Sequence, residues 1–170
     1  MKRHRKNNLL PTYVISSVLK ITPRLCKELG IEAMLLDIDN TLTTHNNPEP
    51  YIGLFRWIDR LQDAGVELII FSNNNHRRVA NFARRLDLPY VARAAKPLPF
   101  MIRKTMDRYR LSRESTVIVG DQLFTDILGA NLANIYSVLV TTITPEHGWF
   151  FRLKRKWEKK ILDAARKEIL

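Results

Sequence analysis

The chain has 170 residues, of which 45% are hydrophobic and 26% are charged. This length favours one globular domain with a single core, so we expect residues 1–170 to form one unit. The chain contains no apolar run of about 18 residues or more, the length that a membrane-spanning helix needs, and no signal-type leader; we therefore expect a cytoplasmic protein.

Charge and cysteine content narrow the range of functions further. The 28 Lys and Arg residues against 17 Asp and Glu residues give a net charge of +11, which predicts an anionic partner or substrate. The single cysteine, Cys26, excludes an internal disulfide framework. It has no Cys or His companions at ligand spacing, so we expect a buried or half-buried apolar side chain.

The N-terminal part of the chain begins with basic residues and continues as an amphipathic stretch. Residues 2–6 hold four basic side chains. The segment Tyr13–Lys20 is expected to form a short amphipathic helix, which leads into a turn at Thr22 and Pro23.

From residue 33 to residue 140, short β-rich runs alternate with helical patterns. Candidate strands are expected at 33–37, 67–71, 89–92, 116–120 and 136–140. The apolar positions at helical spacing between them are Leu54, Trp57, Ile58 and Leu61; Val79, Phe82 and Leu86; Phe100, Ile102 and Met106; and Ile127, Leu128 and Leu132. This alternation predicts an α/β fold in three layers, with helices on both faces of a parallel sheet.

The first of these strands ends in two carboxylates, in the stretch "MLLDIDNTLT" at residues 34–43. In open parallel sheets, ligands bind beyond the carboxyl ends of the strands, and Asp37 and Asp39 are expected at such an end. Two carboxylates so close repel each other unless a cation neutralises them. The pair therefore predicts a hard divalent cation such as Mg²⁺.

Polar residues also follow the later strands. Ser72 and Asn73 follow the second strand and could bind phosphate oxygens. Lys96 follows the third, directly before a proline that favours a helix start, and Asp121 and Asp126 follow the fourth. Taken singly, each has a structural alternative: a turn, a helix cap, a surface charge or an ion pair. Their joint occurrence at successive strand ends favours a site.

In this combination the sequence resembles the haloacid dehalogenase-like (HAD) phosphatase superfamily. The resemblance runs from about residue 33 to residue 140. The matching positions are DIDNT at 37–41, which includes Thr41, then Ser72, Lys96, and Gly120-Asp121 with Asp126.

The resemblance implies a role for each matching residue. It implies that Asp37 is the nucleophile that attacks phosphorus and that Asp39 is the general acid and base. It implies Mg²⁺ held by Asp37, the backbone carbonyl of Asp39 and Asp121, with Asp126 supporting the metal site. The phosphoryl group and substrate are expected to contact Thr41, Ser72, Asn73 and Lys96, with Lys96 also keeping Asp37 ionised.

The spacing of the motifs leaves no room for a cap domain. Only 34 residues separate Asp37 from Ser72, and 23 separate Ser72 from Lys96. Within the superfamily, the chain resembles the capless subfamily IIIA group of YqeG-type proteins and phosphatidylglycerophosphate phosphatases, in "FSNNN", "KPLPF" and "VIVGDQLFTDILGANLANIYSVLVTTI". We therefore expect a Mg²⁺-dependent phosphomonoester hydrolase that forms an aspartyl-phosphate and acts on phosphatidylglycerophosphate.

The C-terminal segment, about 149–170, combines a basic face with an apolar face at helical spacing. Such a helix can lie on an anionic membrane surface, which would place the protein peripherally on the inner face of the membrane. Packing of the same apolar face on the sheet or on another subunit is the alternative.

Several alternatives remain open from the sequence. The substrate could instead be a nucleotide, a sugar phosphate or a nucleic-acid end, and a net charge of +11 also suits a non-catalytic RNA-binding module on the same scaffold. A homo-oligomer could enclose the open site. His147 could contact the substrate, or it could be an exposed loop residue. Arg77 and Arg78 could bind a second phosphate, or they could begin a solvated helix face.

Overall fold

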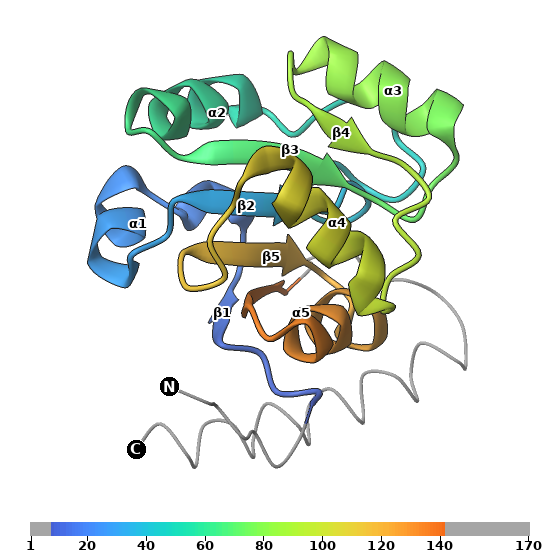
Figure 1. Cartoon of the computed structure of the whole chain (residues 1–170). Helices are drawn as coiled ribbons and strands as arrows, with labels where there is room; N and C mark the ends of the chain where they lie inside the picture. Colours follow the sequence, from blue (N-terminus) through green and yellow to red (C-terminus); the bar gives the residue numbers. More distant parts are fainter. Residues whose placement is uncertain (1–7, 142–170) are drawn as a thin grey trace.

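The structure is a computed structural model in which residues 8–141 are described. Its centre is a six-stranded sheet with the order β1-β6-β5-β2-β3-β4, in which every neighbouring pair is parallel (Figure 1). The strands are β1 (Tyr13–Ile15), β2 (Ala33–Leu36), β3 (Glu67–Phe71), β4 (Tyr90–Val91), β5 (Thr116–Gly120) and β6 (Tyr136–Val140). Because β2 has β3 on one side and β5 on the other, the chain reverses its direction across the sheet at β2, where ligands bind in open α/β sheets.

Helices cover both faces of the sheet. The helices are α1 (Pro23–Leu29), α2 (Leu54–Asp63), α3 (His76–Arg85), α4 (Pro99–Tyr109) and α5 (Leu128–Ala133), with a short 3-10 helix η1 (Val18–Lys20) and a π-helix η2 (Leu123–Ile127). Successive residues of β2 point to opposite faces, so that Met34 packs in the core with buried residues of α1, α2 and α3, whereas Leu35 packs with those of α4 and α5.

This arrangement confirms the predicted three-layer α/β fold. Between β2 and β3 the chain forms only α2, and between β3 and β4 it forms only α3. No cap domain interrupts the segment from Asp37 to Lys96.

The N-terminal prediction was wrong over the segment Tyr13–Lys20. Its first part is strand β1, which pairs in parallel with β6 at the edge of the sheet, and only its last part is helical, as η1. Pairing with β6, more than 120 residues away, outweighs the local helical pattern. The expected turn at Thr22 and Pro23 is the start of α1: the Thr22 hydroxyl accepts a hydrogen bond from the N–H of Leu25, and Pro23 is the first helical residue.

The predicted apolar faces are confirmed in α2 and α3 and are partly wrong in the later helices. In α4 the buried side chains are Ile102, Thr105 and Met106, whereas Phe100 is 59% exposed, because it lies two residues before Ile102 and therefore on the opposite side of the helix. In α5 small residues form the buried face and Leu132 is exposed. A Cβ on Gly129 would lie 3.3 Å from the Pro97 Cα, so the glycine allows the close approach of α5.

Smaller differences concern strand ends, and some predictions lie outside the described part of the chain. β2 ends one residue earlier than expected, and the strand expected at 89–92 is shortened to β4. Cys26 is buried as predicted, and burial raises the pKa of its thiol to about 11. Residues 2–6, His147 and the helix predicted at about 149–170 lie outside the described residues. Within residues 8–141, no helix has the length and hydropathy needed to cross a membrane.

Candidate active site

The site lies at the carboxyl edge of the three strands β2, β3 and β5. Asp37 directly follows β2, and its N–H still donates to the Val119 carbonyl at 3.0 Å, so β5 holds the main chain of Asp37. Ser72 follows β3 and is 1% exposed. Register places β2 between β3 and β5, and the side chains that follow these strands therefore converge at one edge.

Lys96 joins two of the predicted carboxylates. Its Nζ lies 2.8 Å from Asp37 Oδ1 and 2.6 Å from Asp126 Oδ1, and its side chain is only 2% exposed. Burial on its own lowers the pKa of Lys96, but Asp126 and Asp37 outweigh that effect and leave the pKa above its ordinary value. Complete burial raises the pKa of Asp126 to about 6; Lys96 opposes this rise and Asp37 adds to it. The ammonium of Lys96 is therefore held charged between two carboxylates.

The main chain of Lys96 is fixed by Asn73. Asn73 Oδ1 accepts a hydrogen bond from the Lys96 N–H at 2.8 Å, and Asn73 Nδ2 donates to the Lys96 carbonyl at 3.0 Å. These two bonds connect the loop after β3 to the loop after β4. The side chain of Asn73, which was predicted to contact substrate, thus has a positioning contact in the structure.

Asp126 reaches the site because the chain folds back after β5. Its carboxylate is fully buried, and its Oδ2 accepts a hydrogen bond from the Gln122 N–H at 3.1 Å, within the turn that begins η2. A Cβ on Gly120 would collide with the Asp126 carboxylate. The glycine at position 120 therefore has a physical reason: only a residue without a side chain leaves room for the Asp126 carboxylate.

Three carboxylates meet closely enough to hold one metal ion. Single ligand oxygens of Asp37, Asp121 and Asp126 lie within 4.8 Å of one another, and Asn40 Nδ2 donates to Asp121 Oδ2 at 3.3 Å. Three negative charges and the single positive charge of Lys96 leave a net charge of −2. Oxygen ligands with that excess charge fit a divalent cation. We call Asp37, Lys96, Asp121 and Asp126 the Lys96 cluster.

The side chain of Asp39 has different partners. Its Oδ1 accepts hydrogen bonds from Arg78 Nη2 at 2.5 Å and from the Asn46 N–H at 2.9 Å, and its Oδ2 accepts one from Asn74 Nδ2 at 2.6 Å. Asn74 Nδ2 also lies 3.3 Å from Ser72 Oγ, which links the second predicted motif to Asp39. We call Asp39, Asn74 and Arg78 the Arg78 cluster. The metal contact predicted for the Asp39 backbone carbonyl stays a prediction.

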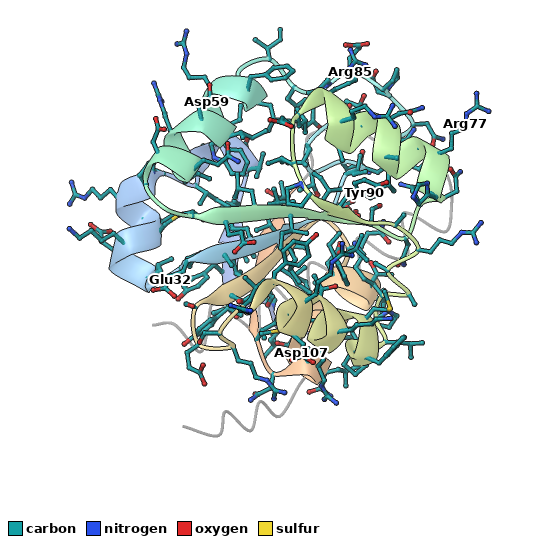
Figure 2. All side chains as sticks on the ribbon, turned by 45° about the horizontal axis from the view of Figure 1, so that its top comes forward. Glu32, Asp59, Arg77, Arg85, Tyr90 and Asp107 are labelled. Atoms are coloured by element: carbon teal, nitrogen blue, oxygen red, sulfur yellow. The ribbon has the colours of Figure 1, made fainter. Side chains whose placement is uncertain are left out.

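The Arg78 cluster contains contacts that the sequence did not indicate. The role of Arg78 was left open between a phosphate contact and a solvated helix face, and Asn74 was not singled out. The only signal was the polar run "SNNNHRR" after β3. Arg77 is exposed and points away from the molecule (Figure 2), whereas Arg78 turns inward with a side chain 22% exposed.

The two predicted hydroxyls are both buried at this edge. The alternative of Ser72 as a helix cap is wrong, because the N-cap of α3 is Asn75, whose side chain accepts a hydrogen bond from the Arg78 N–H at 3.0 Å. Thr41 is fully buried, and its Oγ1 has no hydrogen-bond partner among the described residues. A buried hydroxyl in that state is expected to have a partner in the functional complex.

Comparisons with known proteins agree with this geometry. A family model described as HAD-hydrolase-like matches residues 93–147. The chain is 32% identical to "Probable phosphatase YqeG" of Bacillus subtilis (strain 168) over 163 residues, which are 96% of this chain and 95% of the relative.

Solved structures show the same fold at low sequence identity. An uncharacterized protein from Listeria monocytogenes serotype 4b has a TM-score of 0.58 and 15% identity, covering 69% of this chain and 84% of that chain. The HAD-hydrolase YfnB from Bacillus subtilis, bound to magnesium, has a TM-score of 0.51 and 23% identity, covering 59% of this chain and 49% of that chain. Identity to YqeG extends over almost the whole of both sequences, and the chain therefore belongs to the HAD-like phosphatase family that includes YqeG.

Proposed function

We propose that the protein hydrolyses a phosphomonoester with Mg²⁺ through a phosphorylated Asp37, and that its substrate is phosphatidylglycerophosphate. The observation that carries the chemistry is the contact of Lys96 Nζ with both Asp37 and Asp126 in a buried cluster. A carboxylate nucleophile is repelled by a phosphate ester unless positive charge lies beside it. The ammonium of Lys96 supplies that charge next to the attacking oxygen.

The reaction has two displacements. In the first, a carboxylate oxygen of Asp37 forms a bond to phosphorus, the bond from phosphorus to the alcohol oxygen breaks, and Asp39 gives a proton to that oxygen. In the second, Asp39 takes a proton from a water molecule whose oxygen attacks phosphorus. The bond between phosphorus and Asp37 breaks, which releases inorganic phosphate and restores the carboxylate.

The remaining residues would bind the metal ion and orient the phosphoryl group. Asp37, Asp121 and Asp126, with the Asp39 carbonyl, would hold Mg²⁺, which offsets the negative charge of the phosphoryl group. The buried hydroxyls of Thr41 and Ser72 and the main chain at Asn73 would bind phosphoryl oxygens, together with the Lys96 ammonium.

Exposed apolar side chains beside the site support a lipid substrate. Leu98 is 58% exposed two residues after Lys96, and Phe124 is 49% exposed between Asp121 and Asp126. Phe100, at the start of α4, is 59% exposed. Large exposed apolar side chains close to a catalytic edge are typical of a surface that meets a membrane or another protein.

The charges around these side chains favour an anionic membrane. Residues 88–106 hold four basic residues and no acidic residue, and the only charged residue in the segment 122–141 is the buried Asp126. An anionic lipid surface would meet no exposed carboxylate on these two segments. We extend the proposal to residues 1–170 as one unit that lies peripherally on the inner face of the membrane, with the basic segment at about 149–170 as a second contact.

Phosphate release tests both parts of the proposal. The wild type and Asp37→Asn are compared on phosphatidylglycerophosphate in mixed micelles and on soluble nucleotide, sugar and aryl phosphates, with Mg²⁺ and with EDTA. We expect Mg²⁺-dependent turnover that is far higher on the lipid and is absent in Asp37→Asn. Turnover of soluble esters alone would overturn the lipid substrate, and turnover that persists in Asp37→Asn would overturn the role of Asp37.

A double variant separates the apolar surface from the chemistry. Leu98→Ser with Phe124→Ser should reduce turnover of lipid in micelles and leave turnover of p-nitrophenyl phosphate unchanged, because about half of each side chain is exposed to solvent and neither has a role in the proposed reaction. Equal losses on both substrates would argue against a membrane contact at this surface.

A further inference from the structure

Arg78 has contacts that the proposed reaction does not explain. Its Nη2 binds Asp39 Oδ1, and its Nε is buried without a hydrogen-bond partner among the described residues. A buried guanidinium N–H that lacks an acceptor is costly in free energy, so the observed arrangement leaves a donor available. Arg77, its neighbour, points into solvent (Figure 2).

Asp39 is saturated with donors in the same arrangement. Arg78 and the Asn46 N–H occupy its Oδ1, and Asn74 occupies its Oδ2. A carboxylate that transfers a proton to the alcohol oxygen needs one oxygen turned toward that oxygen. Departure of Arg78 to another anion would remove one of the two hydrogen bonds to Oδ1, leaving that of the Asn46 N–H, and would give the guanidinium a new partner.

The surroundings of Arg78 favour an anion. Helix α3 carries four arginines and no acidic residue. Arg85 forms an ion pair with Glu49 at 2.6 Å. Arg78 lies in the first turn of α3, where it contacts Asp39. Because Asp39 serves the alcohol oxygen in the proposed reaction, Arg78 lies beside the alcohol part of the substrate and not beside the transferred phosphoryl group.

We infer that Arg78 forms a second anion-binding subsite, which recognises a negative group on the alcohol part of the substrate. The inference rests on the proposed phosphatase function and narrows its substrate to phosphomonoesters whose alcohol carries a second anion. On binding, Arg78 exchanges Asp39 for this anion, and Asp39 is released toward the alcohol oxygen. The guanidinium fork suits a phosphodiester or a carboxylate, which can accept two parallel hydrogen bonds.

Soluble substrates test this subsite without a membrane. Glycerophosphoglycerol phosphate, the deacylated head group of phosphatidylglycerophosphate, carries a phosphodiester on its alcohol, 3-phosphoglycerate carries a carboxylate, and glycerol 3-phosphate carries no second anion. The kcat/KM of each is measured for the wild type, Arg78→Ala, Arg78→Lys and Arg77→Ala. Arg77→Ala is the matched control, because it removes the same charge from the adjacent position.

The expected result is a change in selectivity. In Arg78→Ala the ratio of kcat/KM for the head group to kcat/KM for glycerol 3-phosphate should fall about 10-fold or more, the effect of losing a charged hydrogen bond. Arg78→Lys should retain part of the ratio, and Arg77→Ala should keep it within about 2-fold, since exposed charges act weakly. A parallel fall for 3-phosphoglycerate would show that a carboxylate also binds, and retention of its rate would restrict the subsite to the phosphodiester.

A binding measurement separates this inference from the proposed reaction. Calorimetry with Asp37→Asn and with Asp37→Asn/Arg78→Ala, in Mg²⁺, measures the affinity for the head group and for glycerol 3-phosphate. Selective loss of head-group affinity, about 10-fold, supports the subsite even if the wild type turns over neither ester. Equal changes for both ligands in Arg78→Ala, in binding and in turnover, would overturn the inference while leaving the phosphatase activity in place.

Discussion

The two carboxylates that follow β2 have different partners, although only one residue separates them. Asp37 belongs to the Lys96 cluster, where a lysine that is 2% exposed holds it beside Asp126. Asp39 belongs to the Arg78 cluster, where a partly exposed arginine and an asparagine bind its two oxygens. All the carboxylates of both clusters are buried, and the difference lies in the cations: the Lys96 side chain is 2% exposed, whereas that of Arg78 is 22% exposed. The proposed nucleophile Asp37 therefore has a buried cation beside it, whereas the proposed acid and base Asp39 is bound by a cation that solvent and other anions can reach.

The largest effect is expected from removing the central cation of the Lys96 cluster. Lys96→Met leaves Asp37 and Asp126 unpaired in a buried site, which should lower the free energy of unfolding by about 3–5 kcal/mol. Turnover should fall about 10³-fold, because a charge beside the reacting phosphoryl group is lost. Urea unfolding and phosphate release measure the two effects. Lys104→Met, at an exposed position of α4, is the control, and wild-type stability in Lys96→Met would contradict the buried contact.

The Arg78 cluster should respond in catalysis more than in stability. Asp39→Asn removes the proton donor, so turnover of an alkyl phosphate should fall about 10²-fold, the lower end for general acid catalysis. p-Nitrophenyl phosphate, whose leaving group needs little protonation, should lose much less. Steady-state rates on both esters measure the difference. An equal loss on the two esters would mean that Asp39 does not protonate the alcohol oxygen.

A glycine tests how tightly the Lys96 cluster is packed. A Cβ at position 120 would collide with the carboxylate of Asp126, so Gly120→Ala should lower the free energy of unfolding by about 1–3 kcal/mol, a common cost of overpacking. It should also weaken Mg²⁺ binding, because displacement of Asp126 widens the three-carboxylate group. Thermal unfolding and calorimetric titration with Mg²⁺ measure these effects, and unchanged values in both would show that the carboxylate has room to move.

The smallest effect is expected at Asn73, whose side chain is hydrogen-bonded to the main chain of Lys96. Asn73→Ala removes two hydrogen bonds to the Lys96 main chain, and the free energy of unfolding should fall by about 1–2 kcal/mol. Asn81→Ala, on the exposed face of α3, is the control. If Asn73→Ala changes only the KM and leaves stability at the wild-type value, Asn73 acts on the substrate and not on Lys96.

The same comparison explains how far the sequence could predict the site. Asp37, Ser72, Lys96 and Asp121 follow strand ends, and a parallel sheet brings its strand ends to one edge whatever the intervening helices do. Arg78 and Asn74 depend on the rotation of α3 and on the path of a short loop. Two adjacent arginines offer equal charge in sequence, and only the helix start at Asn75 decides which of them faces Asp39.

The fold was predictable for a similar reason. The prediction failed where the local sequence pattern and the long-range strand pairing disagree. Short, β-branched buried runs such as Thr116–Gly120 are typical of a central parallel strand. Strand β1 consists of three residues with high β-propensity, Tyr, Val and Ile, but three residues are too few to show an alternating strand pattern, and its pairing with β6 lies far away in the sequence. The side of α4 that faces solvent was also misjudged, because Phe100 is as apolar as the side chains that the helix buries.

The most direct test of the account is to trap the phosphorylated residue. Wild-type protein is mixed with substrate and Mg²⁺, quenched in acid and reduced with borohydride, which converts an aspartyl-phosphate to homoserine, and the digested peptides are read by mass spectrometry. We predict homoserine at position 37 in the wild type and none in Asp37→Asn. Homoserine at Asp39, Asp121 or Asp126, or trapping that persists in Asp37→Asn, would contradict the assignment of Asp37 as the nucleophile.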